Sequence, residues 1–243
     1  MNMGNSALKK GETLIDTAMT LNAMHPDIIV IRHQDSGAPN LLSQKVNCTV
    51  INAGDGRREH PTQALLDLFT IRQELGTVNN LKIAIVGDLL HSRTIFSLVK
   101  MLLNYNVKFY FVFEENSNKE LHPELTKYIK SFLDKKMKNK NMEINTQFID
   151  IVYETDINKV IPVVDVIYMT RNQKERQNNE IICKNKLTLN NFSKAKEKCL
   201  ILHPLPRNDE IDNKLDNDPR SVYFRQMKYG LYLRIAILEM LFS

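Results

Sequence analysis

Residues 49–76, TVINAGDGRREHPTQALLDLFTIRQELG, decide the fold class. They begin with a β-branched apolar run at Thr49–Ile51, pass through a turn rich in glycine and charge, and enter a helical pattern at Pro61. His60 lies at the expected N-cap, Pro61 at the first helical position, and Gly76 just past the last apolar residue, which are typical helix boundaries. A strand followed directly by a helix is the unit from which parallel sheets are built.

The same alternation continues on both sides of this stretch. Short, mostly apolar runs without strict alternation are typical of buried parallel strands, and helical patterns lie between them. The expected strands are Ile28–Ile31, Thr49–Ile51, Ile83–Val86, Lys108–Phe113, Phe148–Val152, Val164–Tyr168 and Leu200–Leu202. The expected helices are Glu12–Asn22, Pro61–Leu75, one that follows His91, and Leu231–Phe242.

These elements predict an α/β protein with two lobes, each a parallel sheet covered by helices. A chain of 243 residues has room for two modest domains. We expect residues 1–75 and 226–243 to form the first lobe, with the terminal helix returning to it, and residues 76–225 to form the second. The Lys- and Asn-rich stretch Asp134–Asn145 is expected to be a solvated surface insertion.

Composition excludes several classes of protein. The 33 Lys and Arg exceed the 28 Asp and Glu by five, but they are scattered rather than gathered into a stripe with aromatics, so we expect no nucleic-acid partner. No apolar run approaches the ~20 residues of a membrane-spanning helix, and no secretory signal opens the chain. The three cysteines, Cys48, Cys183 and Cys199, are odd in number and lack metal spacing, which fits the reducing cytoplasm.

Familiar catalytic motifs are missing from the sequence. There is no phosphate-binding GxxxxGK loop, no HExxH and no GxSxG, and Gly54 and Gly56 lack the third glycine of a dinucleotide fingerprint. Nucleotide, metal and serine-hydrolase chemistry therefore have no support here.

Basic side chains instead follow five of the expected strands. In open parallel sheets, ligands bind beyond the carboxyl ends of the strands, and the planar fork of arginine holds carboxylates and phosphates with two bonds. One such arginine is more often a surface residue, and a histidine before proline is more often only a cap, but five exits together predict a cleft for anions. The groups are Arg32 and His33, Arg57 to His60, His91 and Arg93, Arg171, and His203 to Arg207.

The segment LHPLPR, residues 202–207, is a second unusual feature. Pro204 and Pro206 remove two backbone donors and stiffen the loop, which leaves carbonyl oxygens free to accept hydrogen bonds. Such a loop suits an NH2 group on a ligand; the alternative is a simple rigid turn.

Six blocks of sequence together resemble the aspartate carbamoyltransferase family, in its order and spacing. The sister ornithine carbamoyltransferases typically carry an HCLP segment and an SMG stretch where this chain has HPLPR and MTRNQKER. The six blocks are KKGETL (9–14), VIRH (30–33), NAGDGRREHPTQALLDLFTI (52–71), VGDLLHSRT (86–94), YMTRNQKER (168–176) and LHPLPR (202–207).

The resemblance implies transfer of a carbamoyl group from carbamoyl phosphate to L-aspartate in pyrimidine biosynthesis, with no metal or organic cofactor. It also implies a homotrimer whose sites are shared between subunits. Arg32 and His60 would contact the carbonyl oxygen of carbamoyl phosphate as catalytic residues. The remaining implied ligands of carbamoyl phosphate are Gln63, the backbone carbonyls of Pro204 and Leu205, and Ser6 and Lys10 on a loop lent by the neighbouring subunit; those of aspartate are Arg93, Arg171, Gln173 and Lys10.

One departure from the family pattern concerns the phosphate. Family members carry a helix, a strand and an STRTR-type segment before the region where this chain starts, and nothing like STRTR occurs in these 243 residues. We therefore expect the first lobe to be truncated at its N-terminal side, with weak carbamoyl phosphate binding and slow or absent turnover. The alternatives are a carbamoyltransferase for another amino acid and a non-catalytic, oligomer-forming or regulatory paralogue.

Overall fold

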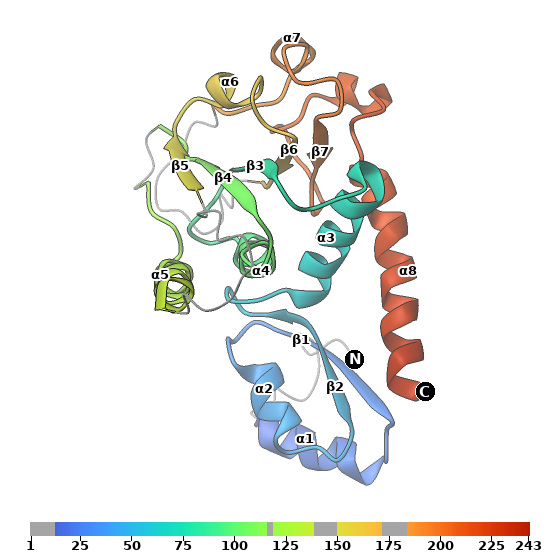
Figure 1. Ribbon diagram of the computed structural model, residues 1–243. Helices are drawn as coiled ribbons and strands as arrows, with labels where there is room; N and C mark the ends of the chain where they lie inside the picture. The colour runs from blue at the N-terminus through green and yellow to red at the C-terminus, as the bar shows by residue number, and fades with distance from the viewer. Residues whose placement is uncertain (1–12, 116–118, 139–149, 172–183) are drawn as a thin grey trace.

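The computed structural model describes residues 13–115, 119–138, 150–171 and 184–243, and these form two parallel sheets (Figure 1). The smaller sheet pairs β1 (Ile28–His33) with β2 (Thr49–Asp55). Helices α1 (Leu14–Ala23) and α2 (Ala38–Ser43) pack against it around a small apolar core.

The larger sheet has the order β5-β4-β3-β6-β7 in the described residues, with every neighbouring pair parallel. Side chains of its central strands point alternately to two separate apolar clusters: Ile83 and Ile85 to one, Ala84 and Val86 to the other. The sheet is therefore covered on both faces, as buried parallel strands require. Its strands are β3 (Leu81–Val86), β4 (Val107–Val112), β5 (Asp150–Glu154), β6 (Val166–Met169) and β7 (Leu200–Leu202); its helices are α4 (Arg93–Leu102), α5 (Pro123–Lys138), α6 (Ile157–Val160) and α7 (Leu189–Phe192).

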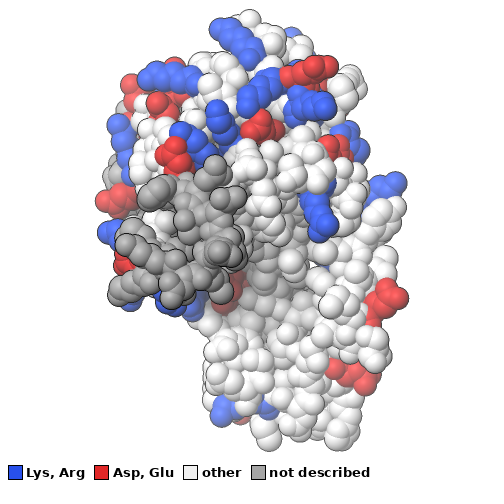
Figure 2. Space-filling view, in the orientation of Figure 1, with Lys and Arg blue, Asp and Glu red and all other residues white. Residues whose placement is uncertain are grey.

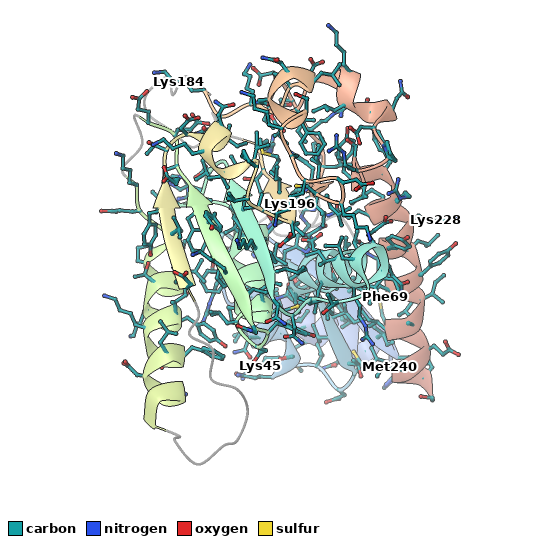
Figure 3. The ribbon with its side chains drawn as sticks, turned by 45° about the horizontal axis from the view of Figure 1, so that its top comes forward. Lys45, Phe69, Lys184, Lys196, Lys228 and Met240 are labelled. Atoms are coloured by element: carbon teal, nitrogen blue, oxygen red, sulfur yellow. The ribbon has the colours of Figure 1, made fainter. Side chains whose placement is uncertain are left out.

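Helix α3 (Pro61–Leu75) connects the smaller sheet to the larger one, and α8 (Tyr223–Phe242) ends the described chain beside it. They pack against each other, with the rings of Phe69 and Tyr229 5.7 Å apart in an edge-to-face arrangement. Figure 3 shows Phe69 beside α8, and Figure 1 shows α8 continuing down alongside the smaller sheet. Because α8 contacts α3 and also β7, it ties the end of the chain to both halves of the molecule.

Most of the expected elements are present. Strands overlap all seven expected strands, although the first two residues of Phe148–Val152 lie outside the described residues. The helix at Pro61–Leu75 has the predicted bounds, with His60 as N-cap and a left-handed Gly76 (φ 76°) as C-cap. Helix α8 begins at Tyr223 rather than Leu231. Its first turns bury Tyr223, Gln226 and Gly230, and a glutamine and a glycine on the buried face give no apolar signal in the sequence.

The predicted surface segment is helical rather than a loop over Asp134–Lys138, which complete α5, and Asp134 and Lys135 are exposed as expected. The helix has apolar residues at Leu125 and Ile129, four apart, which pack on the larger core. The remainder of the predicted insertion lies outside the described residues. The first expected helix begins at Leu14, because Thr13 is its extended N-cap and accepts the backbone N–H of Asp16; Glu12 lies outside the described residues.

Surface charge matches the scattered pattern of the sequence. On the face shown in Figure 2, Lys and Arg are mixed with Asp and Glu over the larger sheet, while the part around the smaller sheet is mostly uncharged. Within the described residues, every helix is too short or too polar to cross a membrane.

Candidate active site

A cavity of about 360 Å³ lies where β1, β6 and β7 end and where α3 and α4 begin. In the larger sheet, β4 and β5 lie on one side of β3, and β6 and β7 lie on its other side. The direction in which strands are added therefore reverses between β3 and β6. Such a reversal opens a crevice at the carboxyl ends of the strands. The residues that line the cavity are Arg32, His60, Gln63, Ser92, Arg93, Thr94, Thr170, Arg171, His203, Pro204, Leu205, Pro206, Met227 and Arg234.

A glycine brings two of the arginines together. Gly54, near the end of β2, has φ 143°, and a Cβ atom there would lie 3.2 Å from Cγ of Arg32 and 3.3 Å from Cζ of Arg93. The guanidinium of Arg93 also donates a hydrogen bond to the carbonyl of Gly56 (3.1 Å). Arg32 and Arg93 thus lie close to the backbone at Gly54, in a space that the side chain of any larger residue would occupy.

His60 begins α3 at the wall of the cavity. Its backbone N–H donates to Oγ of Ser97 on α4 (2.8 Å), and its side chain makes no capping bond. Burial, followed by the charges of Arg93, Arg32 and Arg234, lowers the pKa of His60 to about 4. The imidazole is therefore neutral at physiological pH, and its buried Nδ1 has no hydrogen-bond partner among the described residues.

The exits of β3 and β6 approach each other closely. Gly87 follows β3 with φ 120°, and a Cβ there would lie 2.4 Å from the carbonyl oxygen of Thr170. Thr170 donates its backbone N–H to Val86 (2.9 Å), and Arg171 comes next on the cavity wall. A side chain at Gly87 would separate the two strand ends and displace Arg171.

The loop after β7 is held by a buried histidine. His203 accepts the backbone N–H of Leu205 on its Nδ1 (2.8 Å), so its Nε2 carries the hydrogen and donates to Glu210 (2.8 Å). Both His203 and Glu210 are buried. This arrangement presents Pro204 and Leu205 to the cavity from a fixed position.

Five basic groups at the predicted exits do not line the cavity: His33, Arg57, Arg58, His91 and Arg207. His33 accepts the backbone N–H of Asp35, and His91 bonds to Asp88 (3.0 Å). Arg58 pairs with Glu124 (3.2 Å), and Arg207 turns away to pair with Asp216. Ser6, Lys10 and Gln173 lie outside the described residues.

Sequence reasoning missed the contribution of α8, which adds Met227 and Arg234 to the wall. A usable signal was present, because Arg234 and Glu239 are the two charged residues in the otherwise uncharged run Leu231–Phe242.

The described lining contains four arginines and no Asp or Glu. A cavity lined by one sign of charge concentrates ligands of the opposite sign, and guanidinium groups hold carboxylates and phosphates with paired hydrogen bonds. The open N-terminus of α3 adds partial positive charge at the same place. The arrangement is therefore suited to small anions whose reacting groups must be brought together.

Comparisons with known proteins agree with this geometry. A family model described as aspartate/ornithine carbamoyltransferase, Asp/Orn binding domain, matches residues 79–241, and one described as the carbamoyl-P binding domain of the same family matches residues 1–73. The chain belongs to the aspartate/ornithine carbamoyltransferase family.

Members named for aspartate carbamoyltransferase are among the most similar relatives. The catalytic subunit from Pelagibacter ubique is 45% identical over 98% of this chain and 72% of its own length, and that from Pyrobaculum islandicum is 41% identical over 97% and 73%.

Solved structures of the family share the fold. Aspartate transcarbamoylase from Trypanosoma cruzi in complex with carbamoyl phosphate matches with a TM-score of 0.85 at 34% identity, over 98% of this chain and 73% of that one. The same enzyme in complex with aspartate and phosphate matches with a TM-score of 0.83 at 35% identity, over 98% and 71%.

Proposed function

We propose that this protein transfers the carbamoyl group of carbamoyl phosphate to L-aspartate, giving N-carbamoyl-L-aspartate and phosphate. The observation that carries the proposal is the convergence of Arg32, His60, Gln63, Arg93 and Arg171 on one cavity. The names of the relatives, and the ligands named for the Trypanosoma cruzi structures, support the same reaction.

The cavity has two sides that suit the two substrates. On one side, Arg32, His60 and Gln63 come from β1 and the start of α3, where the resemblance expects carbamoyl phosphate. On the other side, Arg171 follows β6 of the larger sheet, where the resemblance expects the carboxylates of aspartate. Holding both anions in one cavity converts a bimolecular reaction into a local one.

The chemistry requires stabilisation of an oxyanion. The amine nitrogen of aspartate attacks the carbonyl carbon, a C–N bond forms, and negative charge develops on the carbonyl oxygen. The guanidinium of Arg32 and an N–H of neutral His60 would donate to that oxygen. The C–O bond to phosphate then breaks, and the proton lost by the amine passes to the departing phosphate.

Substrate assays test the proposal directly. Arg171→Ala should raise the KM for aspartate by about 10- to 100-fold, because an arginine–carboxylate hydrogen bond is lost, while the KM for carbamoyl phosphate changes little. Lys228→Ala, on the outer side of α8 in Figure 3, is the matched control for loss of a cation. Carbamoylation of another amino acid in preference to aspartate would contradict the aspartate assignment, and absence of turnover with intact substrate binding would favour the non-catalytic paralogue.

The assembly and the location follow from the same assignment. We propose a homotrimer in which Ser6 and Lys10 of each subunit complete the site of the next. A cytoplasmic location is supported by Cys48 and Cys199, which are both free thiols.

We also propose the lobe division 1–75 with 226–243 and 76–225. Its support is the packing of α8 on α3, with Glu74 paired to Arg225 at 2.9 Å where the lobes meet. Gln173 is proposed as a further aspartate ligand.

A further inference from the structure

A buried carboxylate lies behind the wall of the cavity. Asp67 is fully buried on α3, and its Oδ1 accepts hydrogen bonds from Nε2 of Gln63 (2.8 Å) and Nε2 of Gln226 (2.5 Å). Its Oδ2 accepts the hydroxyl of Tyr168 on β6 (2.8 Å). One carboxylate therefore joins α3, β6 and α8 at the base of the site.

This carboxylate decides which atom of Gln63 is available to a ligand. An ionised carboxylate only accepts hydrogen bonds, so Gln63 must turn its NH2 group toward Asp67. The carbonyl oxygen of the Gln63 amide is then the atom left for a partner in the cavity, which Gln63 lines. Without a fixed acceptor such as Asp67, either the NH2 group or the carbonyl oxygen of the Gln63 side chain could face the cavity.

The same carboxylate orients a second amide. Gln226 also turns its NH2 group to Asp67, and its Oε1 accepts the backbone N–H of His203 (3.0 Å). His203 in turn holds the N–H of Leu205, at the centre of the proline-bracketed loop. Asp67 is thus connected to both parts of the wall that offer oxygen acceptors.

We propose that Asp67 is a positioning residue that keeps this side of the cavity lined with acceptors, and so selects a ligand carrying an NH2 group over one of the same shape carrying a methyl group. The inference rests on the proposed function, which places carbamoyl phosphate here. Carbamoyl phosphate and acetyl phosphate have the same charge and differ by NH2 against CH3. A methyl group would leave buried acceptors unpaired, which is how polar sites reject isosteric analogues.

The protonation of Asp67 sets the conditions for a test. Burial raises the pKa of Asp67 to about 7, although the hydrogen bonds from Tyr168, Gln63 and Gln226 oppose the shift. Measurements at about pH 8.5 therefore examine the ionised form.

The experiment is a comparison of binding constants. The Kd values of carbamoyl phosphate and acetyl phosphate are measured by calorimetry for the unmodified protein, Asp67→Leu and Tyr168→Phe. Asp67→Leu has a similar shape but removes both oxygens that accept from Gln63 and Gln226, so the preference for carbamoyl phosphate should fall about tenfold. Tyr168→Phe removes a bond to the same carboxylate but keeps both Oδ1 contacts, so its preference should stay within about twofold of the unmodified protein.

The outcomes separate this inference from the proposed function. An unmodified protein that binds neither ligand contradicts both. One that prefers carbamoyl phosphate, with an unchanged preference in Asp67→Leu, overturns the role of Asp67 alone. An equal loss in Tyr168→Phe would show general loosening of the site and would also overturn it.

A second measurement needs no change to Asp67. The side-chain NH2 resonances of Gln63 are assigned by their loss in Gln63→Met and followed in the unmodified protein. Donation to a buried carboxylate predicts slow exchange of one Gln63 amide proton with water. Rapid exchange of both protons would overturn the inference even where Asp67→Leu fails to fold.

Discussion

The charge state of His60 depends on the residues around it rather than on the residue itself. An exposed histidine is partly protonated near neutral pH, but here burial and three guanidinium groups lower the pKa to about 4. A second cation is thereby avoided beside Arg32 and Arg93, and the imidazole keeps a neutral N–H. The local electrostatics therefore leave His60 with the neutral N–H that the proposed oxyanion contact requires.

This shift predicts a pH dependence of stability. The folded pKa lies below the unfolded value of 6.5, so the unfolded state binds more protons between pH 6.5 and 4, and His60 stabilises the fold less as the pH falls through that range. Because His60 is only partly buried, we expect an effect on the order of 2 kcal/mol. Urea unfolding of the unmodified protein and of His60→Gln at pH 7 and pH 4.5 measures it. Equal losses in the two proteins would show that His60 contributes nothing.

Gly54 provides a second prediction for a single residue. Gly54→Ala adds a Cβ at 3.2 Å from Arg32 and 3.3 Å from Arg93, at a φ that disfavours alanine, so both guanidinium groups must shift. We expect kcat/KM to fall more than about tenfold, since small displacements of positioned groups are costly. Gly37→Ala is the matched control, because Gly37 also has a positive φ but no atom within 4 Å of an added Cβ. A similar loss of activity in both variants would contradict the role assigned to Gly54.

At the scale of elements, the contact between α3 and α8 depends on another glycine. Gly230 lies inside α8 and is buried, and a Cβ there would lie 2.9 Å from Cδ2 of Leu66 and 2.9 Å from a guanidinium nitrogen of Arg234. A glycine inside a helix costs stability compared with alanine, so close packing is the physical reason for its place here. The contact also sets how Met227 and Arg234 reach the cavity.

Gly230→Ala should therefore destabilise the protein despite the better helix propensity of alanine. We expect a loss of about 1–3 kcal/mol in the free energy of unfolding, measured with urea. Leu66→Val in the Gly230→Ala background shortens the opposing side chain and should recover part of the loss, which a double-mutant cycle quantifies. Stabilisation by Gly230→Ala would mean that the helices do not pack this closely.

At the scale of the whole molecule, the cavity forms only where distant parts of the chain meet. The smaller sheet supplies Arg32, the larger sheet supplies Arg171, and α8 closes the wall with Arg234. In the proposed trimer, a neighbouring subunit also contributes to the site, through its Lys10.

Subunit mixing tests the shared site. Arg32→Ala and Lys10→Ala should each be nearly inactive, but trimers reassembled from an equal mixture should recover about a quarter of the activity, because some sites combine an intact Arg32 with an intact Lys10 from the next subunit. A mixture of Arg32→Ala and Arg93→Ala is the control, since both residues belong to the same subunit body and no intact site can form. A protein that sediments as a 28.2 kDa monomer would contradict the trimer.

Local sequence determined the parallel α/β class, the seven strands and the bounds of α3, because alternation of apolar runs and the caps at His60 and Gly76 are local signals. It also located the strand ends at which the cavity forms. The pattern did not indicate that Arg32 and Arg93 line the cavity, while His91 bonds to Asp88 and Arg207 pairs with Asp216.

Only the tertiary structure decided the network around Asp67 and the place of Arg234. Tyr168 lies 101 residues from Asp67 in sequence, and Gln226 lies 159 residues away. Whether a buried carboxylate meets donors, and which end of an amide faces a ligand, depends on neighbours that periodicity does not encode.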